Sequence, residues 1–406
     1  MINPANNTVA DIRQNRIFSF YFISLFIMSL CVSAVTYFTN ISMVQYSVEV
    51  LGTTLPLAGT IAGAANFGSF IITFACGMLS NHVNKKILVR TAALLYTVAT
   101  LGYATFRNPM IVICFRIIAG FAAGINFTSA MVLVTEVLPK DKITEGVGYY
   151  GLASTLMQSF GPMLALIIIR RWGYNINFIT AGSLALVGFL CSFVLPDSIP
   201  HHDAKASKTT LSKVLGEVVC KESWLPACVG FVFALINGMQ QALILSYSKV
   251  IGSEAYTGTY FLVISVMMII SRIILGKFIQ SKTVAFAVTF SGIFLVGTTL
   301  FLGLGSITAT MLIGAGLFGI GYGTLLPVTQ SMSVKLAPEG RKGSGSSTYH
   351  MGTTSAFFIA PVFGSFLADP NGMNLGFNNA FLMLSVPCVI GIALACWKGR
   401  FLINQK

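Results

Sequence analysis

The chain has 406 residues, of which 55% are hydrophobic and only 9% are charged. Because soluble domains carry about 25% charged residues, this composition excludes an ordinary globular enzyme and favours an integral membrane protein. The net charge of +13 does not indicate nucleic-acid binding, since the basic residues lie in short segments between apolar runs. The eight cysteines are scattered without paired spacing, so we expect no disulfide framework, no metal site and no cofactor.

Apolar runs long enough to cross a bilayer, which takes roughly 20 residues, recur along the whole chain. They predict an all-α membrane protein with twelve transmembrane helices. The predicted helices span 17–48, 55–80, 87–106, 110–138, 143–169, 175–196, 223–250, 255–279, 283–303, 307–336, 343–368 and 374–397.

The longest polar stretch of the sequence separates six predicted helices from the other six. It predicts an N-terminal six-helix bundle at 1–196, a cytoplasmic linker at 197–221 and a C-terminal six-helix bundle at 222–406. An internal repeat at an offset of 199 residues supports this division, because Pro162 then corresponds to Pro361. We therefore expect two pseudo-symmetric bundles.

Lysines and arginines are distributed unevenly over the predicted loops. With the N-terminus placed in the cytoplasm, 19 of the 25 basic residues lie on the cytoplasmic side, four lie outside and two lie within spans. Cytoplasmic loops are enriched in basic residues in this way. The asymmetry predicts a multi-pass protein of the inner or plasma membrane with both termini in the cytoplasm.

Segments of the first predicted bundle resemble motifs of the major facilitator superfamily, and the resemblance extends over essentially the whole chain. The segment between the second and third helices resembles the signature loop at Gly77, Lys85 and Lys86, although Asn81 replaces the usual Asp. In the fourth helix, Arg116 and the glycine four residues later resemble a second motif. The resemblance implies the major facilitator fold.

A third segment, in the fifth predicted helix, carries Gly148 and the pair Gly161-Pro162. These residues resemble the motif of the antiporter members, the twelve-helix exporters of drugs and metabolites, although other glycines of that motif are replaced. The resemblance implies efflux of a small organic solute by alternating access, with protons as the candidate coupling ion. It also implies that helices 1, 4, 7 and 10 line a central cavity.

Polar side chains at mid-depth on those four helices are the candidates for solute binding, because polar groups without partners are costly within a bilayer and are therefore functional candidates. The candidates are Ser33, Thr36, Asn40, Asn126, Asn237, Gln240, Gln241 and Tyr322. Amides both donate and accept hydrogen bonds, which suits a polar, uncharged or zwitterionic solute. The alternative, that these groups only hold helices together, stays open.

A second set of residues is predicted to serve coupling or gating. The set is Arg116, Glu136, His350, Gly161, Pro162 and Pro361. No carboxylate lies at the centre of a predicted span, so His350 is the best group within the spans that titrates near neutral pH. The two prolines kink their helices, as alternating access requires. Structural hydrogen bonding is the alternative role for Arg116 and His350.

We expect a secondary active transporter, without a nucleotide-binding loop, that exports a small solute. The alternative is an importer of a polar metabolite, acting by uniport or proton symport, and a more remote one is a non-transporting membrane sensor. An enzyme is not expected, because the sequence contains neither Gly-x-Ser-x-Gly nor His-Glu-x-x-His. The expected partners are the solute and the lipid bilayer, and we expect a monomer.

Overall fold

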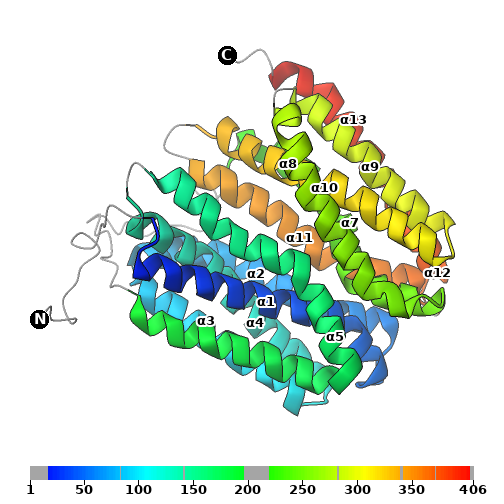
Figure 1. The fold of residues 1–406 in the computed structure, drawn as a ribbon, viewed down its shortest axis with the longest axis horizontal. Helices are drawn as coiled ribbons and strands as arrows, with labels where there is room; N and C mark the ends of the chain where they lie inside the picture. The colour runs from blue at the N-terminus through cyan, green and yellow to red at the C-terminus, as the bar shows by residue number, and fades with distance from the viewer. Residues whose placement is uncertain are drawn as a thin grey trace, which may run out of the picture. The chain divides into compact units, whose positions relative to one another are not determined.

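The computed structural model describes residues 17–82, 84–139, 142–195, 219–280, 283–338, 342–370 and 372–402. Every regular element in these ranges is a helix, as Figure 1 shows. The α-helices are α1 (Phe20–Glu49), α2 (Leu55–His82), α3 (Lys85–Thr105), α4 (Pro109–Val137), α5 (Ile143–Cys191), α7 (Trp224–Val250), α8 (Thr257–Gln280), α9 (Val284–Leu304), α10 (Thr308–Leu336), α11 (Lys342–Ala368), α12 (Gly376–Met383) and α13 (Ser385–Leu402). Short 3₁₀ helices lie at η3 (Ser192–Val194), η4 (Lys221–Ser223) and η5 (Glu254–Tyr256).

Eleven helical segments of the described chain are long and apolar enough to cross a membrane. The protein is therefore an all-helical, multi-pass membrane protein, as the sequence predicts. One of these segments, Glu145–Val194, has 50 residues, which at about 1.5 Å per residue is more than twice the thickness of the hydrocarbon core. It contains Gly173, whose φ of 83° and ψ of 176° interrupt α5. This glycine lies between the predicted helices 143–169 and 175–196.

The last predicted helix, 374–397, is divided into two helices. α12 ends at Met383, and α13 begins at Ser385. Pro387 explains the division, because it has no N–H to offer the carbonyl of Met383 and its ring crowds the preceding turn.

Two compact units make up the described chain. One contains Met1–Thr39 and Phe67–Val214 as far as they are described, and the other contains Asn40–Asn66 together with the described part of Leu215–Lys406. Helices α1 and α2 therefore each contribute to both units. The predicted bundles, 1–196 and 222–406, divide the chain differently and stay a prediction. Most of the predicted linker lies outside the described residues.

Side chains satisfy the polar backbone groups at several helix ends, where the helix itself leaves them unpaired. Asn84 and Asn108 cap the first turns of α3 and α4 by accepting hydrogen bonds from backbone N–H groups. In the second unit, Asn378 Nδ2 donates to the carbonyl of Gly305, 2.7 Å away, directly after α9. The Tyr247 hydroxyl donates to the same carbonyl at 3.0 Å. These bonds fix the ends of α3, α4 and α9.

Candidate solute-binding site

Helix α7 concentrates buried amide side chains at mid-length. Asn237, Gln240 and Gln241 are 4%, 1% and 8% exposed. Gln241 Nε2 donates to Asn237 Oδ1, one helical turn away, at 3.0 Å. Within the described chain, Asn237 Nδ2 and both amide atoms of Gln240 have no hydrogen-bond partner. Because unpartnered buried amides are unfavourable, this part of α7 is the strongest candidate for contact with a polar solute.

Helix α10 adds Tyr322 to this group. The Tyr322 hydroxyl lies beside the Asn237 amide, and its ring stacks on Phe318 with centroids 5.0 Å apart. Gly319 allows α10 to approach α8 closely, because a Cβ there would lie 2.6 Å from the carbonyl oxygen of Ile264. The structure thus brings together three residues that the sequence predicted for binding, namely Asn237, Gln241 and Tyr322.

A small pocket of the second unit opens beside Gln241, with a cavity volume of about 10 Å³, roughly the space of one water molecule. Residues from α1, α2, α7 and α11 line it, and three of them carry amides. The lining residues are Asn40, Ala62, Asn66, Gly238, Gln241, Ala242, Phe357 and Pro361. We call it the amide pocket. Its lining thus includes Asn40, which was predicted for solute binding, and Pro361, which was predicted for coupling or gating.

Asn66 was not predicted from the sequence. It is the amide that α2 contributes to the pocket, and Asn66 Nδ2 donates to the carbonyl oxygen of Phe357 at 3.3 Å. That carbonyl lies four residues before Pro361, which has no N–H to offer it. Gly63 lets α2 come this close, since a Cβ there would lie 2.7 Å from the Phe358 carbonyl. An inventory of amides within all predicted spans, rather than within four, would have found Asn66.

In the first unit, a group of hydroxyls surrounds Arg116. Arg116 is 2% exposed, and its Nη1 donates to the hydroxyl of Thr39 at 3.4 Å. The hydroxyls of Tyr96 and Tyr103 lie near the guanidinium, and Tyr96 also shares a hydrogen bond of 2.7 Å with Thr36. Thr36, predicted for solute binding, therefore belongs to the surroundings of Arg116 in this structure.

Two other predicted binding residues lie in the first unit. Asn126 of α4 is 6% exposed, and its Oδ1 has no hydrogen-bond partner within the described chain. Ser33 of α1 is partly buried. Asn126 thus has the same kind of unpartnered amide atom as Gln240.

The predicted coupling residues have different surroundings. Glu136 Oε1 accepts an ion pair from Lys85 Nζ at 2.9 Å, which joins the start of α3 to the end of α4. His350 is partly buried on α11, and its Nε2 lies 3.5 Å from the hydroxyl of Thr354. Gly161 lets α5 pack closely on α1, because a Cβ there would lie 2.9 Å from the Cβ of Tyr37.

The remaining predicted residues are described in part. Pro162 is buried within α5. In the signature loop, the backbone N–H of Lys86 donates to Asn84 Oδ1 at 3.0 Å. Gly77 and Asn81 belong to the last turns of α2, and their side-chain surroundings lie outside the described residues.

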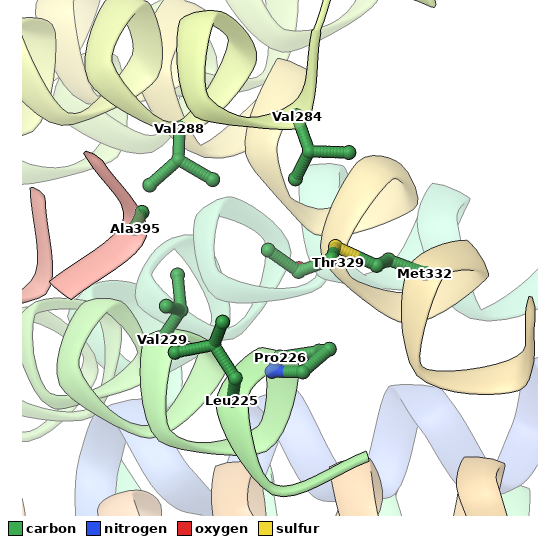
Figure 2. A pocket seen from close by; sticks show the side chains of 8 residues that line it. All are labelled: Leu225, Pro226, Val229, Val284, Val288, Thr329, Met332 and Ala395. Carbon is green, nitrogen blue, oxygen red and sulfur yellow. The ribbon is translucent and has the colours of Figure 1, made fainter. Parts of the chain in front are cut away.

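A second pocket of this unit is apolar (Figure 2). It is lined by Leu225, Pro226, Val229, Val284, Val288, Thr329, Met332 and Ala395. Its one hydroxyl, on Thr329, is already bonded to the carbonyl of Leu325 and to the hydroxyl of Tyr349. This pocket offers a polar solute nothing to bind.

Two relatives are similar to this chain in sequence over half of its length or more. An uncharacterized MFS-type transporter from Methanocaldococcus jannaschii is 22% identical over 341 residues, which cover 80% of this chain and 85% of that protein. The quinolone resistance protein NorA of Staphylococcus aureus is 24% identical over 226 residues, which cover 54% of this chain and 55% of that protein.

Solved structures of transporters share the fold. A bacterial homolog of the human lysosomal transporter Spinster has a TM-score of 0.78 at 10% identity, over 96% of this chain and 98% of that one. A POT family transporter in complex with 5-aminolevulinic acid has a TM-score of 0.79 at 13% identity, over 98% of this chain and 100% of that one. The sequence model of the Major Facilitator Superfamily matches residues 25–306 and 283–400 of this chain. The chain therefore belongs to the major facilitator superfamily, and it is a membrane transporter of small-molecule solutes.

Proposed function

We propose that this protein is a secondary active transporter that exports a small polar organic solute by alternating access. The observation that carries the proposal is the row of unpartnered amide atoms on α7, those of Gln240 above all. An amide that only holds helices together needs a partner on a neighbouring helix. Gln240 has none within the described chain, which favours contact with a solute.

The proposed architecture has twelve crossings in two six-helix halves, 1–196 and 222–406, with both termini in the cytoplasm. The length of α5 and its interruption at Gly173 support two crossings in that segment. The distribution of basic residues supports the orientation and a place in the inner or plasma membrane. The solute would bind as two halves rock around it.

Two observations support export. Gly148 and the pair Gly161-Pro162 resemble the antiporter motif, and the chain is similar over about half its length to a quinolone resistance protein. We assign coupling to protons and to His350, whose imidazole lies on α11, because no carboxylate lies at the centre of a predicted span. Glu136 is the weaker candidate, since its carboxylate is already held in an ion pair with Lys85.

Counterflow in proteoliposomes tests the proposal. Vesicles holding the protein are loaded with unlabelled solutes from a broad panel, and uptake of the labelled solute is measured. We expect exchange of at least one solute, and a decrease of about tenfold in Gln240→Leu, the loss expected for one or two hydrogen bonds. The control is Gln330→Leu, which removes an exposed amide of α10 and should exchange at the original rate.

The same vesicles test coupling when an opposed pH gradient is imposed. His350→Ala should abolish the acceleration by the gradient and leave counterflow in place, because counterflow needs no driving ion. Absence of exchange over the whole panel would contradict transport. If the solute moves only in the same direction as the protons, as in a proton-coupled importer, the result would contradict export by proton antiport.

A further inference from the structure

The amide pocket has a polarity that follows from how its side chains are already bonded. Asn66 uses its donor, Nδ2, on the Phe357 carbonyl. The orientation of this amide is fixed, because a carbonyl oxygen can only accept and Pro361 leaves it without the usual helical donor. Asn66 Oδ1 has no hydrogen-bond partner in the described chain and is the group left for a solute.

The amide of Gln241 also uses its nitrogen for a bond within the protein. Its Nε2 donates to Asn237 Oδ1 at 3.0 Å, and Gln241 Oε1 has no partner among the described residues. Two helices, α2 and α7, thus each present an amide oxygen to the pocket and keep the amide nitrogen engaged elsewhere. A solute that donates hydrogen bonds matches these oxygens, whereas a solute that only accepts leaves both unpaired.

The rest of the lining excludes a charged solute end. None of the eight lining residues is ionisable, and five of them present apolar surface or backbone. An ion placed there would lose its hydration without gaining a counter-charge. The pocket has room for about one water molecule in this structure, so it must widen during alternating access to admit an organic solute. The ring of Phe357 and the side chain of Pro361 then offer a surface on which a flat apolar group can pack.

We propose that the amide pocket binds an uncharged solute through N–H or O–H donors next to a flat apolar group, and that Asn66 determines this specificity. This inference rests on the proposed transport function and narrows its substrate class. It assigns to Asn66 two simultaneous roles: its nitrogen holds the kinked segment of α11, and its oxygen contacts the solute.

Four small aromatic probes of nearly equal size separate the possibilities. N-methylbenzamide and methyl benzoate differ by the exchange of one N–H for an oxygen, while benzoate and benzylammonium carry a negative and a positive charge. Binding of each to the detergent-solubilised full-length protein is measured from the rise in melting temperature with concentration. We expect N-methylbenzamide to bind about tenfold more tightly than methyl benzoate, and both ions to bind more weakly than the amide.

Variants then locate the effect. Asn66→Leu should reduce the affinity for N-methylbenzamide to that for methyl benzoate, and Gln241→Met should do so in part. Gln330→Leu is the matched control and should keep the full difference between the two probes. Since the wild-type comparison of the four probes needs no variant, the test stands even if Asn66→Leu does not fold.

Several results would overturn the inference. If methyl benzoate binds as tightly as N-methylbenzamide, the pocket does not prefer hydrogen-bond donors. If either ion binds more tightly than N-methylbenzamide, the pocket does not prefer an uncharged solute. No shift with any probe means that the pocket is not the site. In each of these cases counterflow of other solutes can still demonstrate transport, so the proposed function fails only if that exchange is absent.

Discussion

At Gly59, the absence of a side chain decides how closely α2 approaches α11. A Cβ at this position would overlap the carbonyl oxygen of Pro361 and the hydroxyl of Ser365. The hydroxyl can rotate away, but the carbonyl belongs to the backbone of α11. Close backbone approach through small residues is how membrane helices pack without a hydrophobic driving force.

We expect Gly59→Ala to destabilise the protein by about 1–3 kcal/mol, the cost of overpacking a tight contact. The melting temperature in detergent measures the change. The matched control is Gly151→Ala in α5, where a Cβ would have nothing within 4 Å and the helix favours alanine. Equal melting temperatures for the two variants would contradict the close contact.

The sequence alone does not show that Gly59 lies in a tight contact and Gly151 in open space, since both lie within predicted apolar helices. An inventory of amides could include Asn66 but could not show what it binds, because its partner Phe357 lies 291 residues further along the chain. By contrast, the amides of α7 could be predicted as candidates, because they follow from composition and depth alone. Whether Gln240 has a partner is decided by neighbouring helices, which the sequence does not place.

Prolines within helices free carbonyl groups, and side chains of neighbouring helices bind two of them in this structure. Pro361 frees the carbonyl of Phe357, which accepts from Asn66, and Pro327 of α10 frees that of Gly323. Arg272 Nε of α8 donates to the Gly323 carbonyl at 3.4 Å. This bond gives Arg272, a basic residue within a predicted span, a structural role.

Pro361→Ala should restore the helical hydrogen bond to the Phe357 carbonyl and leave Asn66 Nδ2 without its partner. We expect a straighter α11, an unchanged or higher melting temperature, and a counterflow rate lowered by about tenfold, because proline kinks permit bending. Pro226→Ala is the control, since Pro226 lies in the first turn of α7, where no N–H is needed. A variant at Pro361 with the original exchange rate would show that the kink has no part in transport.

The elements themselves could be predicted within a few residues, because lipid obliges the backbone to form helices and apolar runs mark them. The gap predicted between 169 and 175 contains the glycine that interrupts α5. The division between α12 and α13 was missed, although Pro387 is visible in the sequence. A proline within an apolar run is compatible with a kink as well as with a break, so the pattern alone does not decide.

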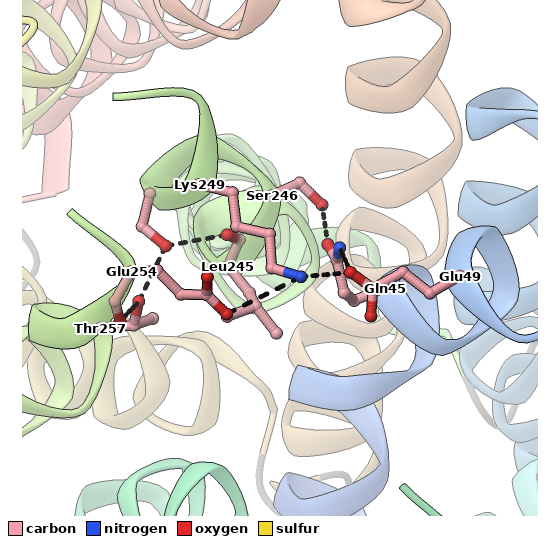
Figure 3. A network of polar contacts seen from close by, with 8 residues as sticks. Gln45, Glu49, Leu245, Ser246, Lys249, Glu254 and Thr257 are labelled. Atoms are coloured by element: carbon pink, nitrogen blue, oxygen red, sulfur yellow. Dashed lines mark hydrogen bonds and ion pairs between the residues drawn. The ribbon is translucent and has the colours of Figure 1, made fainter. Parts of the chain in front are cut away.

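A charged network joins the C-terminal ends of α1 and α7 (Figure 3). Within the second unit, Lys249 of α7 forms ion pairs with Glu49 at the end of α1 and with Glu254 of η5. Gln45 donates to Glu49 at 2.6 Å and accepts from Ser246 at 2.7 Å. In the proposed architecture α1 and α7 belong to different halves, so opening the external side must break these contacts.

Reversing one charge should therefore favour separation of the two helix ends. The side chains of Lys249 and Glu49 are 31% and 37% exposed, so the pair contributes only about 0.2–1 kcal/mol. We expect Lys249→Glu to raise the population of the separated state by about two- to fivefold. Distances between spin labels at Thr54→Cys and Val250→Cys, in a variant without other cysteines, measure this population.

The control is the exchanged pair, Glu49→Lys with Lys249→Glu, which restores attraction between α1 and α7. Its rescue should be partial, because Glu254, whose carboxylate lies 3.7 Å from the Lys249 ammonium, would then face a like charge. Adding Glu254→Gln should complete the rescue. Since the groups are partly exposed, about 1 M salt should reduce the difference between all variants. Identical distance distributions in the single and exchanged variants would mean that other contacts, such as that of Gly59 with α11, hold the helix ends together.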